Sequence, residues 1–211
     1  MNEQKIQMVF FDAAGTLFDV RGSVGEIYAR FAAQYGKHVA AEELQSEFVR
    51  HFPQQPPMAF ARTLTHPERL QAEQNWWRTL VCDVFAGFGE FPHFEDYFVE
   101  VFEFFRRAEA WMVFTDVEPT LVALKARGLR LGVISNFDAR LYDVLDTLQL
   151  RTYFDSVHIS TEVGAAKPDP AIFQAALTAQ ALHPTQALHI GDSLSADVQG
   201  ARAAGLSALW L

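Results

Sequence analysis

The sequence contains one cysteine, a minority of basic side chains and no long apolar run. Because Cys82 is the single cysteine among 211 residues, no disulfide bond can form within the chain. The 17 Lys and Arg residues are outnumbered by 26 Asp and Glu residues, and the formal net charge of -9 argues against a general nucleic-acid binder, which needs a basic surface. No segment is long and apolar enough to predict a transmembrane helix.

The composition predicts a globular protein of the cytoplasm. The N-terminal residues MNEQKIQ do not have the pattern of a signal peptide. Half of the residues are hydrophobic, so the chain can bury the core of one large domain or of two small ones. The acidic composition still allows an anionic substrate, because a site can be positive locally. We expect a small-molecule substrate, no nucleic-acid or membrane partner, and a monomer or homodimer.

Five short apolar runs are typical of buried parallel strands. Helical patterns lie between them, one of them with Asp169 as its N-cap and Pro170 at its first helical position. Strands that alternate with helices indicate an α/β domain with a parallel sheet. The expected strands are residues 6–11, 129–134, 157–160, 187–191 and 207–211, and the expected helices are 116–128, 139–150, 170–180 and 196–205.

Residues 20–112 break this alternation and are helical wherever they have a period. A Pro-rich loop at residues 52–57 interrupts them. The sequence therefore predicts a core domain of residues 1–19 and 113–211, and an all-helical cap domain of residues 20–112 inserted after the first strand. The expected cap helices are residues 23–36, 42–52, 67–85 and 94–109.

Polar side chains follow four of the expected strands. Because the carboxyl ends of parallel strands share one edge of the sheet, where ligands of open α/β sheets bind, we expect these side chains to converge. His189, within the fourth of these strands, is interpreted as a core histidine. The converging residues are Asp12 after the first strand, Ser135 and Asn136 after the second, Lys167 after the third, and Asp192 and Asp197 after the fourth.

These residue types suit the chemistry of phosphate esters. A carboxylate can attack phosphorus or carbon and form a covalent ester. Several carboxylates with a backbone carbonyl can bind a hard cation such as Mg²⁺. Lys167 and the Ser135 hydroxyl can hold phosphate oxygens, and Gly15 lets backbone N–H groups approach an anion closely.

Four motifs together resemble the haloacid dehalogenase-like hydrolase superfamily, which has a Rossmann-like core and an inserted cap. Four further stretches resemble its rhythmically-expressed-gene-two-like branch: WW at 76–77, ISNFDAR at 134–140, EVGAAKPDPAIFQAAL at 162–177 and LHIGDS at 188–193. The four motifs are DAAGT at 12–16, SN at 135–136, KPDP at 167–170 and GDSLSAD at 191–197.

The resemblance implies a Mg²⁺-dependent phosphatase that acts on a small phosphorylated metabolite through an aspartyl-phosphate on Asp12. Asp12 and Lys167 would be the catalytic residues, and the cap would close over the site and select the leaving group. Mg²⁺ would be held by Asp12, the Ala14 carbonyl and Asp192, with Asp197 beside it. The implied substrate-binding residues are Ala13, Ala14, Ser135, Asn136 and Lys167.

Ala14 departs from the pattern of the superfamily. Most of its phosphatases have an aspartate two places after the nucleophile, which protonates the leaving oxygen and later activates water. Loss of such an acid/base typically costs on the order of 10²- to 10⁴-fold in rate. The chain could therefore be a slow phosphatase, or one that acts on esters with good leaving groups.

Ala14 is also compatible with a different reaction or with a loss of turnover. Haloacid dehalogenases have tyrosine at this position and lack the Gly-Asp of the fourth motif, present here as Gly191-Asp192. Phosphonoacetaldehyde hydrolase has alanine but needs a cap lysine, and the only lysine of the expected cap is Lys37, in a turn. A binding or regulatory protein that has lost efficient turnover would need no acid/base at all.

Overall fold

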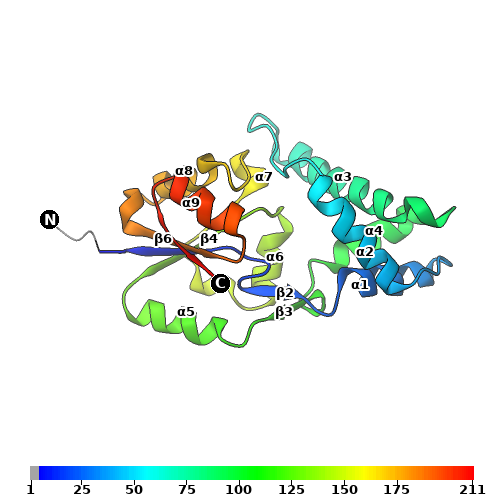
Figure 1. Cartoon of the computed structure of the whole chain (residues 1–211), viewed down its shortest axis with the longest axis horizontal. Helices are drawn as coiled ribbons and strands as arrows, with labels where there is room; N and C mark the ends of the chain where they lie inside the picture. Colours follow the sequence, from blue (N-terminus) through cyan, green and yellow to red (C-terminus); the bar gives the residue numbers. More distant parts are fainter. Residues whose placement is uncertain (1–4) are drawn as a thin grey trace.

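The computed structural model describes residues 5–211, and its centre is a five-stranded parallel sheet. The strand order is β5-β4-β1-β6-β7, so the N-terminal strand β1 lies in the middle (Figure 1). The five predicted strands are confirmed, with ends that differ by one or two residues. The strands are β1 Met8–Phe11, β4 Arg130–Ser135, β5 Ser156–Ile159, β6 Ala187–Gly191 and β7 Ser207–Trp210.

Helices cover both faces of this sheet (Figure 1). Side chains alternate along β1, so Met8 and Phe10 share one buried cluster with α8 and α9, whereas Val9 and Phe11 share another with α5 and α6. The predicted α/β fold class is thereby confirmed. The helices of this part are α5 Val117–Ala126, α6 Arg140–Thr147, α7 Ser160–Val163, α8 Pro170–Ala179 and α9 Gly200–Ala203, with the 3-10 turns η4 Arg151–Tyr153 and η5 Pro184–Gln186.

Local signals set several helix ends, with two corrections to the predicted ranges. Asp169 accepts a hydrogen bond from the Ala171 N–H (2.9 Å), which confirms it as the N-cap of α8. The predicted helix 139–150 ends at Thr147. The predicted helix 196–205 begins earlier, as the π-helical turn η6 (Leu194–Gln199), because the Ser193 hydroxyl accepts from the Ala196 N–H (3.1 Å).

Four helices lie between β2 and β3 and form the helical part of the molecule (Figure 1). Capping boxes at Ser23 with Glu26 and at Thr65 with Glu68 begin α1 and α3. The predicted fourth helix is too long, since residues after Phe104 form a separate short turn. The elements are α1 Val24–Gln34, α2 Ala41–His51, α3 His66–Phe85 and α4 Phe94–Phe104, with 3-10 turns η1 Phe52–Gln54, η2 Ala86–Phe88 and η3 Ala108–Ala110.

A two-stranded antiparallel ribbon, absent from the sequence prediction, joins the helical part to the sheet (Figure 1). It consists of β2 (Phe18–Val20) and β3 (Trp111–Val113). Strands of three residues are too short to show an apolar pattern, so the sequence does not predict them. The predicted boundaries between the core and cap domains, at 19/20 and 112/113, fall within this ribbon. These domain boundaries stay a prediction.

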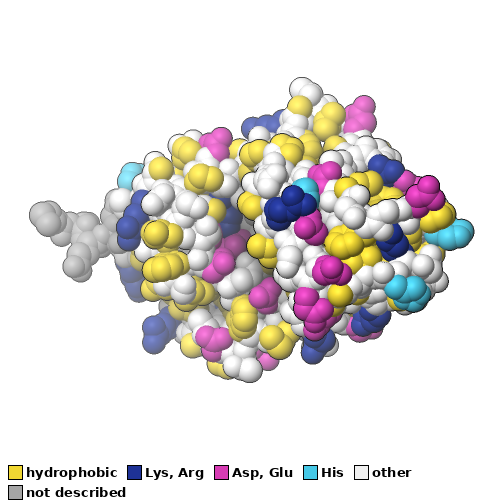
Figure 2. Space-filling view, turned by 45° about the vertical axis from the view of Figure 1, so that its right-hand side comes forward, with side chains coloured by type: hydrophobic (Ala, Val, Ile, Leu, Met, Phe, Trp, Pro, Cys, Tyr) yellow, Lys and Arg dark blue, Asp and Glu magenta, His cyan; other side chains and the backbone are white. Residues whose placement is uncertain are grey.

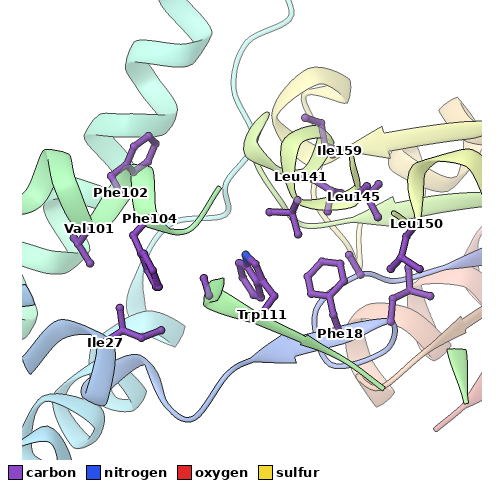
Figure 3. Close-up of a cluster of buried hydrophobic side chains, with 14 of the residues drawn as sticks. Phe18, Ile27, Val101, Phe102, Phe104, Trp111, Leu141, Leu145, Leu150 and Ile159 are labelled. Atoms are coloured by element: carbon purple, nitrogen blue, oxygen red, sulfur yellow. The ribbon is translucent and has the colours of Figure 1, made fainter. Parts of the chain in front are cut away.

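One hydrophobic cluster extends across the ribbon from the helical part to the sheet. In Figure 3, Trp111 lies between Phe104 and Ile27 on one side and Phe18 on the other. The rings of Phe18 and Trp111 pack edge to face, with centroids 5.1 Å apart. The helical part is therefore packed on the sheet domain through a shared core. Within residues 5–211, none of the helices combines the length and the apolar character needed to cross a membrane.

Candidate active site

Four charged residues from three segments, which follow β1, β5 and β6, meet at the carboxyl edge of the sheet. The Lys167 ammonium lies 2.8 Å from Asp12 Oδ1 and 2.5 Å from Asp197 Oδ1. One carboxylate oxygen from each of Asp12, Asp192 and Asp197 lies within 4.8 Å of the others. The expected convergence is thus present: a carboxylate, an ammonium group and an acidic cluster occupy one place.

Lys167 is buried and held in position by its neighbours. Burial alone would lower the pKa of its side chain, but the charges of Asp12 and Asp197 outweigh this effect and raise the pKa, so Lys167 stays an ammonium ion. Asn136 fixes its backbone by a reciprocal pair of hydrogen bonds: the Asn136 amide donates to the Lys167 carbonyl (2.9 Å) and accepts from the Lys167 N–H (2.7 Å). Asn136 therefore positions Lys167, and its contact with substrate stays a prediction.

Asp197 is almost fully buried and accepts three hydrogen bonds. They come from Lys167, from His189 Nε2 (2.8 Å) and from the Ser193 N–H (3.0 Å). Burial would raise the pKa of Asp197, but the His189 hydrogen bond and the Lys167 charge lower it to about 2. A Cβ at Gly191 would lie 2.2 Å from Asp197 Cγ, so the glycine at this position makes room for the carboxylate.

His189 is the member of this network that sequence reasoning assigned only to the core. Its side chain is fully buried, and burial lowers its pKa. The neutral ring donates from Nε2 to Asp197, so it holds the carboxylate that in turn holds Lys167. In the sequence, the one signal of this role was the position of His189 on the strand that leads to Asp192.

Asp192 and Asp12 form a crowded acidic pair. Partial burial first, and the negative charge of Asp12 second, raise the pKa of the Asp192 carboxyl, although the residue keeps an exposed side. Gly15 has a φ of 84°, and a Cβ there would lie 2.7 Å from Asp192 Oδ2. Trp210 Nε1 donates to the Asp192 carbonyl (2.7 Å) and fixes its backbone. Facing carboxylates with this charge crowding fit a hard divalent cation such as Mg²⁺.

The remaining predicted residues lie around this cluster. Ser135 is buried at the end of β4, in the strand that neighbours β1. Ala13 is buried, and its carbonyl accepts from the Leu17 N–H (2.7 Å). Ala14 is half-buried and lines a cavity with Gly15 and Asp192. The Ala14 side chain, a methyl group, can neither donate nor accept a proton at this place in the cavity wall.

A cavity of about 490 Å³ leads from Ala14 and Asp192 to the helical part. Figure 2 shows a hollow where the two parts of the molecule meet, with acidic side chains at its rim. Aromatic side chains from α1, α2, α3, β3, the 3-10 turn η1 and two loops line the cavity. The sequence did not identify them as a group, because only folding brings them together: Tyr28, Phe48, Phe52, Trp77, Phe105, Trp111 and Phe137.

A buried ion pair lies at one wall of the cavity. Arg140 donates from Nε to Asp138 Oδ1 (2.9 Å) and from Nη2 to Asp138 Oδ2 (2.6 Å). Trp77 of α3 donates to the same carboxylate (2.6 Å), and Arg140 donates to the Phe102 carbonyl of α4 (3.2 Å). The loop after β4 is therefore tied to two helices of the helical part.

Lys37 has a structural role. Its ammonium group donates to the backbone carbonyls of Phe88, Gly89 (3.2 Å) and Glu90 (2.9 Å). It is not part of the cavity wall. This arrangement agrees with the sequence argument against a Schiff-base lysine at that position.

Comparison with known proteins extends over nearly the whole chain. The family model for haloacid dehalogenase-like hydrolases matches residues 6–205. Haloacid dehalogenase-like hydrolase domain-containing protein 3 of Mus musculus is 35% identical over 208 residues, which cover 96% of this chain and 80% of the mouse protein. The rhythmically expressed gene 2 protein of Drosophila melanogaster is 30% identical over 221 residues, which cover 95% of this chain and 81% of the fly protein.

A solved structure gives the same result for the fold. The 2-haloacid dehalogenase from Pseudomonas syringae pv. Tomato DC3000 is 28% identical, with a TM-score of 0.64, and the match covers 97% of this chain and 86% of that chain. The match supports a Rossmann-like core with a helical cap. With the family model and the two relatives, it confirms the resemblance carried by the four motifs. The chain therefore belongs to the haloacid dehalogenase-like hydrolases, in the branch of the rhythmically expressed gene 2 protein.

Proposed function

We propose that this hydrolase is a Mg²⁺-dependent phosphatase that cleaves a small phosphate monoester through an aspartyl-phosphate on Asp12. The observation that carries the proposal is the Lys167 ammonium, 2.8 Å from Asp12, beside an acidic cluster that includes Asp192. A carboxylate nucleophile needs positive charge around the dianionic phosphate it attacks, and this arrangement provides one cation and a place for a second.

In the first step, a carboxylate oxygen of Asp12 attacks phosphorus, and the bond between phosphorus and the ester oxygen breaks. Lys167 and the Ser135 hydroxyl contact the phosphoryl oxygens. Because Ala14 donates no proton, the ester oxygen leaves with the bonding electron pair, as an anion. In the second step, water attacks phosphorus of the aspartyl-phosphate, and the bond between phosphorus and the Asp12 oxygen breaks. Both protons of the water leave with the inorganic phosphate, and the Asp12 carboxylate is restored.

The proposed metal ligands are Asp12, Asp192 and the backbone carbonyl of Ala14. A bound Mg²⁺ would offset the charge of the phosphoryl oxygens as the Asp12 carboxylate approaches. Asp197 already accepts hydrogen bonds from Lys167, His189 and Ser193, so we place it next to the direct ligands, where it positions Lys167. The helical cap, residues 20–112, would select the leaving group through the aromatic cavity.

Two alternatives are weaker. A dehalogenase would bring a carboxylate substrate to Asp12, and the neighbouring Asp192 would repel it in the absence of a cation. A binding or regulatory protein with little turnover is favoured only by Ala14, and it would not need Lys167 buried against the nucleophile.

The test is release of nitrophenol from p-nitrophenyl phosphate with Mg²⁺. We expect Asp12→Asn to abolish the release, because the amide is a far weaker nucleophile of nearly the same shape. Equal rates for the wild-type protein and for Asp12→Asn would refute the phosphatase proposal and favour the binding protein.

A further inference from the structure

We infer that the substrate is an aryl phosphate whose leaving group is an uncharged aromatic alcohol. The inference rests on the proposed phosphatase and names the class of ester that its site takes. Three observations support it: the lining of the cavity, the charges in that lining and the side chain at position 14.

The lining matches a flat, apolar group. Trp77 and Phe137 border the cavity near the site, and Tyr28, Phe48 and Phe52 border it within the helical part. Aromatic rings stack favourably on one another and bury large apolar areas. At about 490 Å³, the cavity is in the size range of sites for small molecules. The uncharged side-chain amides and the serine of the lining, Ser23, Gln45 and Asn136, already bond backbone groups, so a sugar or a polyol would leave most of its hydroxyl groups against apolar side chains.

The charges oppose a second anionic group on the leaving alcohol. Among the described residues that line the cavity, Arg140 is the one cation, and both oxygens of Asp138 already occupy its guanidinium. The acidic residues in the lining are Asp19 and Asp192. Beyond the proposed metal site, a carboxylate or second phosphate on the leaving group would meet no free positive charge and would face the negative charge of Asp19.

Ala14 selects for the same class of ester by a separate route. Without a proton donor, the ester oxygen must depart as an anion, and a phenolate is far more stable than an alkoxide because the ring delocalises its charge. The cavity and the missing acid thus favour the same chemical group, an aromatic alcohol attached directly to the phosphate oxygen.

The test compares kcat/KM for phenyl, 2-naphthyl and 3-carboxyphenyl phosphate in the presence of Mg²⁺. The phenols that these three esters release have similar acidity, so the esters differ mainly in the apolar area and the charge of the leaving group. The larger apolar area should make the naphthyl ester better than the phenyl ester by about tenfold. The carboxyphenyl ester should be worse than the phenyl ester by a similar factor. Equal values for the three esters, or a preference for the carboxyphenyl ester, would overturn the inference while leaving the phosphatase intact.

A pair of variants tests the cavity itself. Phe52 lines it and is partly exposed, so Phe52→Ala should fold and should lower the ratio of naphthyl to phenyl kcat/KM severalfold. Val49, in α2 just before Phe52, is 60% exposed and does not line the cavity, so Val49→Ala should keep the wild-type ratio. An unchanged ratio of naphthyl to phenyl kcat/KM in Phe52→Ala would show that the leaving group does not bind against Phe52.

A binding measurement separates failure of the inference from failure of the proposed function. If no ester is hydrolysed faster than by Asp12→Asn, the phosphatase proposal fails. Calorimetry with phenylphosphonate and phosphonoacetate, which this route cannot hydrolyse, then tests the cavity alone. Phenylphosphonate should bind at least about tenfold more tightly, because its ring is apolar and phosphonoacetate has a second charge. Equal affinity, or tighter binding of phosphonoacetate, would overturn the inference.

Discussion

In the proposed mechanism, Asp12 is a nucleophile without an acid/base at position 14. Lys167 lies beside it, and the half-buried Ala14 methyl group borders the cavity. Attack by Asp12 needs only the carboxylate and nearby positive charge, whereas release of the aspartyl-phosphate needs a base to activate water. The missing group should therefore have different consequences for the two steps.

The restoration of an acid/base at position 14 is the first prediction. Ala14→Asp should raise kcat for alkyl phosphates by about 10²-fold or more, because it supplies the acid and then the base. The aspartyl-phosphate, visible as an added mass in the intact protein after rapid quenching, should accumulate in the wild-type protein and decline in the variant.

The control is the double variant Asp12→Asn with Ala14→Asp, which should be inactive. If Ala14→Asp folds but is no faster than the wild-type protein, another residue acts as the acid/base. Asp19, the other carboxylate of the cavity wall besides Asp192, would then be the first to test.

The second prediction concerns the metal ligands. Asp192→Asn should weaken Mg²⁺ binding by at least about tenfold, measured by calorimetry, because it removes one charged oxygen ligand. The side chain is exposed, so the fold should survive. Asp19→Asn is the matched control, since Asp19 lines the same cavity outside the acidic cluster. Unchanged affinity in Asp192→Asn would remove Asp192 from the metal site.

At the scale of the elements, short loops after the strands set the geometry of the site. Asn136, just after β4, binds the backbone of the loop that carries Lys167, so hydrogen bonds join the two loops. A similar bond supports the other end of β4, where Asp155 Oδ2 accepts from the Leu131 N–H (2.8 Å) and from Lys125 of α5 (2.9 Å). Polar side chains thus join elements at both ends of this strand.

The third prediction is the pH dependence of the Asp155 contribution. Burial would raise the pKa of Asp155, but the Leu131 N–H and Lys125 lower it below the ordinary value. A lowered pKa means that the carboxylate stabilises the folded state above about pH 4 and that this contribution is lost as the pH falls through the lowered pKa. Urea unfolding should show Asp155→Asn less stable than wild type at pH 7, with a smaller difference at about pH 3. A difference independent of pH would show that the charge does not matter.

At the scale of the whole molecule, the helical part and the sheet domain are joined by the β2–β3 ribbon and by a shared hydrophobic cluster. They are also joined by hydrogen bonds from the Asp138–Arg140 ion pair of the sheet domain to Trp77 and to the Phe102 carbonyl. The guanidinium of Arg140 lies 3.9 Å from the centroid of the Phe102 ring and 4.9 Å from that of Trp77. The ion pair therefore sits within an aromatic contact between the two parts.

The fourth prediction concerns this ion pair. Arg140→Ala should lower the free energy of unfolding by about 3–5 kcal/mol, because it leaves the Asp138 carboxylate buried without its partner. The double variant Asp138→Asn with Arg140→Met should lose less, since neither buried charge remains. Urea unfolding measures both. A loss below about 1 kcal/mol in Arg140→Ala would show that the pair does not hold the two parts together.

The sequence by itself determined the elements and the identity of the chemical groups. Apolar runs predicted the five strands. The reason holds best for the three inner strands β1, β4 and β6, since a strand buried on both faces must be apolar along its length. The rule that parallel strands end at one edge of the sheet was enough to bring Asp12, Lys167, Asp192 and Asp197 together. Local capping chemistry predicted the start of α8 at Asp169.

Only the tertiary structure decided what surrounds those groups. The β2–β3 ribbon depends on pairing between residues about 90 positions apart, which leaves no local pattern. His189 resembles any buried histidine until Asp197 folds back against it. The aromatic cavity is built from separate elements, and the same side chains would form ordinary core if those elements packed differently. Contacts between distant segments depend on packing geometry, which the spacing of residues along the chain does not specify.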